Sequence, residues 1–145
     1  MYSVLLPIDG SEERAEAQAR MVTSLPDAGD SVRATLLRVF EDRQTAESTS
    51  VGQLTAGQVA EDVLLDAGVA VDSKTTYGDA AEEILRTADE VDADLIVLGG
   101  RKRSPLGSLL FGSVSQAVTL DATRPVVVTG GVEEREETER PAATG

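Results

Sequence analysis

Two residue types that carry much of enzyme and metal chemistry are missing from this chain. The sequence contains no histidine and no cysteine. The missing histidine excludes Ser-His-Asp triads and imidazole acid–base catalysis, and the missing cysteine excludes thiol nucleophiles, disulfides and thiolate-bound metals. We therefore expect a binding protein and not an enzyme with rapid turnover.

The chemistry that remains is concentrated in one basic loop of an acidic chain. Lys and Arg number 13 against 26 Asp and Glu, for a formal net charge of -13, yet no acidic residue lies between Asp94 and Asp121. This stretch holds Arg101-Lys102-Arg103 and reaches Gly112-Ser113, where a helix should begin. Backbone N–H groups and the helix dipole attract anions at such a terminus, so the loop is a candidate phosphate site. Neither G-x-x-x-x-G-K-[ST] nor G-x-G-x-x-G occurs, which argues against a P-loop NTPase and a Rossmann dehydrogenase.

Apolar patterning predicts the elements that position this loop. Short apolar runs alternate with amphipathic stretches, which indicates the order β-α-β-α-β-α-β-α-β and a parallel sheet with right-handed crossovers. The expected strands are Val4 to Ile8, Val32 to Phe40, Val69 to Tyr77, Leu95 to Leu98 and Val126 to Thr129. The expected helices begin near Ser11, near Thr55 (with a Thr55–Gln58 capping box), near Asp79 (with an Asp79–Glu82 capping box) and near Ser113, and Gly68 ends the second. Residues 41–55 are polar and should form a long loop.

The first and fourth strands are the most apolar, so they should be central, and the alternating third strand should be an edge. Ligands of open parallel sheets bind beyond the carboxyl ends of the strands, where the strand order reverses. If the first and fourth strands are neighbours, the sequence Pro7-Ile8-Asp9-Gly10-Ser11 meets the basic loop at that point.

The basic loop resembles a motif of the universal stress protein family, whose fourth strand ends in G-x-x-G followed nine residues later by G-[ST]. Gly99 matches the first glycine, and Gly112-Ser113 match the last pair. The resemblance extends to an apolar first strand ending in Asp9, to Leu109-Leu110-Phe111 before Gly112, and to a last strand at Arg124–Val128. It covers residues 1 to 130.

The resemblance implies a doubly wound, five-stranded open sheet of order 3-2-1-4-5 with helices on both faces. It also implies that ATP, with or without Mg²⁺, is held between the first and fourth strands. Carried over by position, Ile8, Asp9 and Val39 line the adenine and ribose, Gly99 allows close approach to the ligand, and Gly112, Ser113 and Val114 wrap the phosphates. Pro7 and Leu98, at the ends of the two strands, complete the expected site.

One position departs from the family motif, because Lys102 stands at its second glycine. A lysine there blocks the pocket if the backbone needs a positive φ or a close phosphate. Alternatively its ammonium contacts phosphate directly. The sequence therefore leaves two functions open. One is a dimeric adenine-nucleotide-binding stress-response protein, which allows slow ATP hydrolysis by a positioned water and Mg²⁺. The other is a nucleotide-free dimeric interaction module.

Several site residues also have plain structural interpretations. Asp9 with Gly10-Ser11 is good turn chemistry, and its carboxylate could cap the first helix. Ser113 with Gln116 has capping-box spacing. Gly99-Gly100 could be only a strand-ending turn, and Arg101-Lys102-Arg103 a solvated charge run.

The remaining expectations concern the molecule as a whole. The acidic, lysine-poor composition favours a halophilic cytoplasm and disfavours binding to nucleic acid or anionic membranes, and we see no secretory signal or membrane span. Residues 1–131 should form the domain, and the Glu-rich residues 132–145 a mobile tail. The apolar last strand, Val126-Val127-Val128, lacks a charged residue to protect its edge, and the resemblance implies a homodimer through it.

Overall fold

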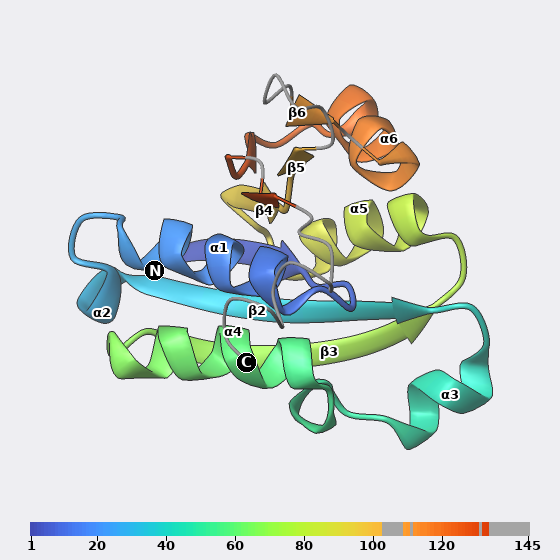
Figure 1. Cartoon of the computed structure of the whole chain (residues 1–145), viewed down its shortest axis with the longest axis horizontal. Helices are drawn as coiled ribbons and strands as arrows, with labels where there is room; N and C mark the ends of the chain where they lie inside the picture. The colour runs from blue at the N-terminus through green and yellow to red at the C-terminus, as the bar shows by residue number, and fades with distance from the viewer. Residues whose placement is uncertain (103–108, 111, 131, 134–145) are drawn as a thin grey trace, which may run out of the picture.

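The computed structural model describes residues 1–102, 109–110, 112–130 and 132–133. Its centre is a parallel five-stranded sheet of order β3-β2-β1-β4-β7 (Figure 1). The strands are β1 (Tyr2–Pro7), β2 (Val32–Phe40), β3 (Ala70–Tyr77), β4 (Leu95–Leu98) and β7 (Val126–Val128). The predicted order 3-2-1-4-5 is confirmed, with β7 as the fifth strand and β3 at the opposite edge.

Helices cover both faces of the sheet, each over its own apolar cluster. Helices α1 (Glu12–Thr23) and α4 (Thr55–Asp66) pack beside each other on one face, over residues that include Val4, Leu6 and Leu36. Helices α5 (Ala80–Glu90) and α6 (Ser113–Asp121) pack on the other, over residues that include Leu5 and Ile96. Alternate residues of a strand point to opposite faces, so the continuous apolar run of β1 serves both clusters.

Local chemistry at three helix ends agrees with the sequence. The Ser11 side chain accepts from Arg14 N and caps α1, and the Asp79 side chain accepts from Glu82 N and caps α5. Only the Asp79 half of the predicted Asp79–Glu82 capping box is present among the described hydrogen bonds. Gly68 follows α4 with φ of 79°, which a glycine adopts without strain.

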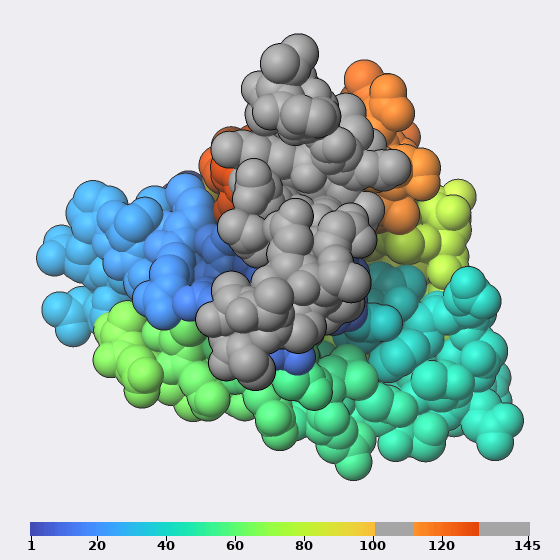
Figure 2. Space-filling model, viewed as in Figure 1, coloured from blue at the N-terminus to red at the C-terminus, as the bar shows by residue number. Residues whose placement is uncertain are grey.

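The prediction of a long loop over residues 41–55 is wrong. Helix α3 (Arg43–Ser48) and the 3₁₀ turn η1 (Val51–Gln53) occupy it, and this segment forms a protruding corner of the surface (Figure 2). A side-chain hydrogen bond to the backbone stabilises the start of each short element. Asp42 Oδ1 accepts from Thr45 N at 2.8 Å, and Gln53 Oε1 accepts from Ser50 N at 2.8 Å.

The predicted Thr55–Gln58 capping box is also wrong. Thr55 is the first helical residue of α4, and Leu54 holds the cap position without a side-chain bond. Gln58 Nε2 donates instead to Gly52 O at 2.9 Å, so it ties the helix to η1.

Further short elements accompany the main sheet. They are α2 (Ala28–Ser31) and a small sheet of order β6-β5-β8, made of β6 (Leu109–Leu110), β5 (Arg101–Lys102) and β8 (Val132–Glu133). The first two residues of the predicted tail thus pair with β5, and residues 134–145 lie outside the described part. Among the described helices, none has the length and apolar character needed to cross a membrane.

Candidate functional site

A cavity of about 370 Å³ opens at the carboxyl ends of β1 and β4. At this point the strand order reverses, since the chain moves outward to β2 and β3 on one side and to β4 and β7 on the other. The structure brings all the predicted site residues except Lys102 to its wall: Pro7, Ile8, Asp9, Val39, Leu98, Gly99, Gly112, Ser113 and Val114. The backbone of Lys102 lies in β5, and its side chain is outside the described part.

Asp9 is held by the turn that it starts. Its Oδ1 accepts from Ser11 N at 2.9 Å, and its Oδ2 accepts from Arg14 Nε at 3.0 Å. The Arg14 side chain is 11% exposed and the Asp9 side chain 56% exposed, so a nearly buried cation fixes a carboxylate at the cavity rim. The interpretation of Asp9 as the cap of α1 is wrong, because Ser11 Oγ accepts the bond from Arg14 N.

The N-terminus of α6 forms the opposite wall of the cavity. Gly112 is the cap residue and has no side chain to offer, and Gln116 N bonds only to Gly112 O among the described contacts. The predicted Ser113–Gln116 capping box is therefore wrong, because Ser113 is the first residue inside the helix. First-turn N–H groups without a side-chain cap attract an anion, and Ser113, Val114 and Ser115 all line the cavity.

Gly99 has a packing role beside its place in the cavity wall. A Cβ at this position would lie 3.0 Å from Arg14 Cβ and 3.3 Å from Gln18 Oε1. The glycine therefore lets α1 approach the end of β4, a packing role that differs from the two predicted from the sequence, close approach of the ligand and a strand-ending turn.

Sequence reasoning missed part of the cavity wall. The additional lining residues are Arg14, Gln18, Leu37, Arg38, Ala80, Ile84 and Ser115. Two of them are cations, which is notable in a chain of net charge -13. Ile84 and Ala80 could have been grouped from the sequence, because residues four positions apart on a helix lie on the same face. Arg38 lies over the Phe40 ring at 5.3 Å from its centre, and the two residues share a face of β2 because they are two positions apart.

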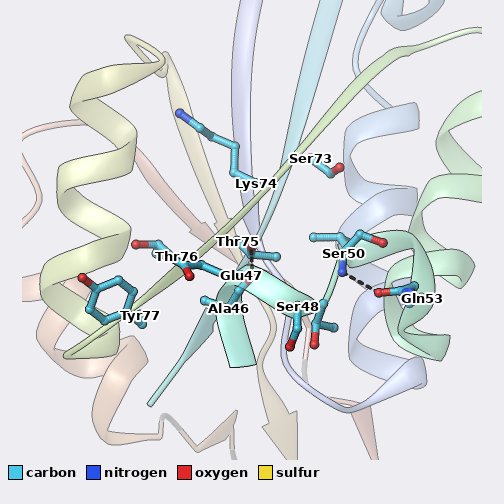
Figure 3. Close-up of a pocket in the computed structure, with 12 residues that line it drawn as sticks. Ala46, Glu47, Ser48, Ser50, Gln53, Ser73, Lys74, Thr75, Thr76 and Tyr77 are labelled. Carbon is cyan, nitrogen blue, oxygen red and sulfur yellow. Dashed lines mark hydrogen bonds between the residues drawn. The ribbon is translucent and has the colours of Figure 1, made fainter. Parts of the chain in front are cut away.

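A second and larger cavity, of about 650 Å³, lies between β3 and the α3–η1 segment (Figure 3). Its wall is rich in hydroxyl groups, including Ser48, Thr75 and Thr76. Thr75 Oγ1 donates to Ala46 O at 2.9 Å and fastens α3 to the strand, while Lys74 extends towards α5 and pairs with Glu90 at 3.1 Å (Figure 3). This cavity follows the edge of the sheet and contains none of the predicted site residues. We therefore take the switch-point cavity as the candidate functional site. No group of acidic residues among the described ones is arranged to hold a metal ion.

Fold and cavity together define a doubly wound α/β domain with a cavity at its switch point. The model of the universal stress protein family matches residues 1–130. A universal stress protein of Mycolicibacterium smegmatis is 37% identical over 97 residues, which span 66% of this chain and 70% of that protein. The chain belongs to the universal stress protein family.

Solved structures share the fold. A universal stress protein of Archaeoglobus fulgidus aligns with a TM-score of 0.70 and 27% identity, over 89% of this chain and 98% of that one. The universal stress protein of Archaeoglobus fulgidus in complex with dAMP aligns at 0.66 and 21%, over 89% and 98% of the chains. A family protein of Arabidopsis thaliana with AMP bound aligns at 0.65 and 18%, over 98% and 97%.

Proposed function

We propose that this protein binds an adenine nucleotide, with ATP as the main candidate, in the switch-point cavity. The observation that carries the proposal is the convergence of the β1 end, the β4 end and the uncapped N-terminus of α6 on one cavity. Its volume of about 370 Å³ lies within the range of small-molecule pockets. The complexes of family members with dAMP and AMP support an adenine nucleotide as the ligand.

The wall divides into an apolar part and a polar part, as a nucleotide requires. The apolar part includes three buried residues, Ile8 after β1, Leu37 in β2 and Ile84 in α5, which offer apolar surface to a base. Asp9, fixed by Arg14, supplies a carboxylate that can accept from ribose or base donors. The first turn of α6 supplies N–H donors for phosphate.

Titration calorimetry with ATP, AMP and adenosine, after mass spectrometry of the purified protein for bound nucleotide, tests this proposal. We expect heat with ATP and a carried-over nucleotide. If Lys102 contacts phosphate, Lys102→Ala weakens ATP more than adenosine and flattens the salt dependence of binding. Wild-type protein that gives neither heat nor nucleotide, with heat appearing in Lys102→Gly, would establish the alternative function, a nucleotide-free interaction module.

We also propose that the protein is a homodimer joined through β7. This strand is the edge of the main sheet, and its side chains Val126, Val127 and Val128 are half-buried in the single chain. An apolar edge strand of this kind invites pairing with a second chain. Light scattering at micromolar concentration in high salt should give the dimer mass for the wild type and the monomer mass for Val127→Glu. A monomeric wild type contradicts the proposal.

Catalysis is not part of the proposed function. The chain offers no histidine or cysteine to act as base or nucleophile. We therefore expect slow phosphate release, if any, when the protein is incubated with ATP, and rapid release would contradict this proposal.

A further inference from the structure

The hydrogen-bond ladder between β1 and β4 ends before either strand does. Its Cα partners are Val4 with Leu95 and Leu5 with Ile96. Beyond them β1 stays paired with β2 as far as Pro7, and β4 stays paired with β7 as far as Leu98. The two strand ends therefore part from each other, and the switch-point cavity lies where they part.

Pro7 accounts for the end of the ladder. Thr129 N donates to Leu98 O at 2.9 Å, so Leu98 bonds towards β7 and, by alternation along the strand, the Val97 carbonyl faces β1. If the register continued, the donor for Val97 O would be the N–H of residue 7. Proline has no N–H, so this acceptor lacks its ladder partner.

The carbonyl of Pro7 also lacks a donor from the neighbouring strand. Ile8 N donates to Leu37 O at 2.8 Å, so Ile8 bonds towards β2 and the Pro7 carbonyl faces β4. A buried carbonyl oxygen, that of Val97, and a partly buried one, that of Pro7, thus face the gap between the two strand ends. Such groups cost free energy unless a donor reaches them.

Gln18 of α1 supplies that donor. Its Nε2 donates to Pro7 O at 2.7 Å and to Val97 O at 2.9 Å. The residue is 1% exposed, and two carbonyl acceptors can be served only by the NH₂ end of the amide, which fixes its orientation. The side chain supplies the donor that the backbone lacks, and it links the ends of β1 and β4 although the two strands are not hydrogen-bonded to each other there.

We propose that Gln18 is a positioning residue that holds the ends of β1 and β4 at the separation the ligand needs. This inference rests on the proposed nucleotide binding. Ile8 and Asp9 follow directly after one braced carbonyl, and Leu98 and Gly99 follow the other, so the brace places both sides of the cavity. Binding geometry must be held to about 0.5 Å by supporting hydrogen bonds, and the two bonds from Gln18 are such supports for the strand ends.

The first test compares Gln18→Met with Val22→Ala. Methionine keeps the length of the side chain and removes the donor, and Val22 is a fully buried residue of the same helix that does not line the cavity. We expect Gln18→Met to lower the affinity for AMP and ATP at least tenfold, and Val22→Ala to leave it within twofold at a similar drop in Tm. Unchanged affinity in Gln18→Met, or an equal loss in both variants, overturns the inference.

The second test needs no nucleotide. Amide hydrogen exchange should become at least tenfold faster at Ile8 and Gly100 in Gln18→Met, with α4 unaffected. Adding Pro7→Ala to that variant returns an N–H at residue 7 and should slow the exchange again, because Val97 O regains a donor. If wild-type protein binds no adenine nucleotide, the proposed function fails while exchange still decides whether the brace exists. Unchanged exchange contradicts the brace, and faster exchange with unchanged affinity contradicts its positioning role.

Discussion

The two outer glycines of the family motif should respond differently to the same substitution. A Cβ on Gly99 would lie 3.0 Å from Arg14 Cβ and 3.2 Å from Arg14 Cδ, whereas a Cβ on Gly112 meets nothing within 4 Å. We therefore expect Gly99→Ala to weaken folding and Gly112→Ala to weaken ligand binding.

The magnitude follows from two opposing effects. Overpacking against α1 costs about 1–3 kcal/mol, while replacing a glycine returns about 0.4–1 kcal/mol by restricting the unfolded chain. This gain applies at position 99 because Gly99 is not among the residues with positive φ, so alanine can adopt its backbone conformation. The net for Gly99→Ala is a loss of about 1 kcal/mol in the free energy of unfolding, or roughly 2–4 °C in Tm. For Gly112→Ala, alanine is a poorer helix cap than glycine and costs about 0.5 kcal/mol. The lower conformational entropy of the unfolded chain offsets this cost.

Urea unfolding and titration calorimetry on both variants measure these effects. Gly112→Ala should unfold like the wild type and bind ATP more weakly, because its methyl group would lie where the proposed site receives phosphate at the start of α6. Gly99→Ala with wild-type stability would refute the packing role of that glycine. Wild-type affinity in Gly112→Ala would show that phosphate does not lie beside it.

Other substitutions and conditions test the rest of the structure. Gly57→Ala should destabilise the protein despite the helix propensity of alanine, worth about 1 kcal/mol, because its Cβ would lie 2.3 Å from Val51 O, whereas Gly52→Ala meets nothing within 4 Å and should be neutral in thermal melts. The hydrogen bond from Arg86 lowers the pKa of Glu83, so the stability that this pair contributes is present above about pH 4.3 and is lost as pH falls through the folded-state pKa. Glu83→Gln should therefore flatten the fall of Tm in acid, and an unchanged slope would contradict this. The net charge of -13 predicts that Tm rises from low to molar KCl, and a flat Tm would remove the halophile hypothesis.

The main elements were predictable because their signals are local. The apolar run of β4 is bounded by Asp94 and Gly99 and spans Leu95 to Leu98 in the structure as in the sequence. The place of the candidate cavity was predictable for a topological reason: because β1 and β4 are neighbours, the residues that follow them meet at one edge of the sheet. Segment 41–55 was missed because α3 and η1 are too short to show a helical period, and their caps resemble loop residues.

Asp9 shows where spacing alone is ambiguous. An Asp-Gly-Ser turn satisfies both the structural and the functional interpretation, and the structure shows how each carboxylate oxygen of Asp9 is held. Ser11 N takes one oxygen for the turn, and Arg14 holds the other at the cavity rim. That arginine lies five positions away, a spacing with no rule behind it, so only the packed helix reveals the pair.

Gln18 is a missed residue for which the sequence did contain a signal. Ala15, Ala19 and Val22 define the buried stripe of α1, and Gln18, three residues after the first and four before the last, falls on that stripe. A polar side chain there must find buried partners, because an unsatisfied amide in the core costs several kcal/mol, roughly 2–7 by transfer measurements. Pro7 at a strand end has no backbone N–H, so a carbonyl of the neighbouring strand lacks its donor. A polar residue on an apolar helix face needs a buried partner, and a proline at the end of a central strand leaves a carbonyl that needs a donor. Together they predict a hydrogen bond from the helix side chain to the strand ends. The structure shows this contact in the two bonds that Gln18 donates.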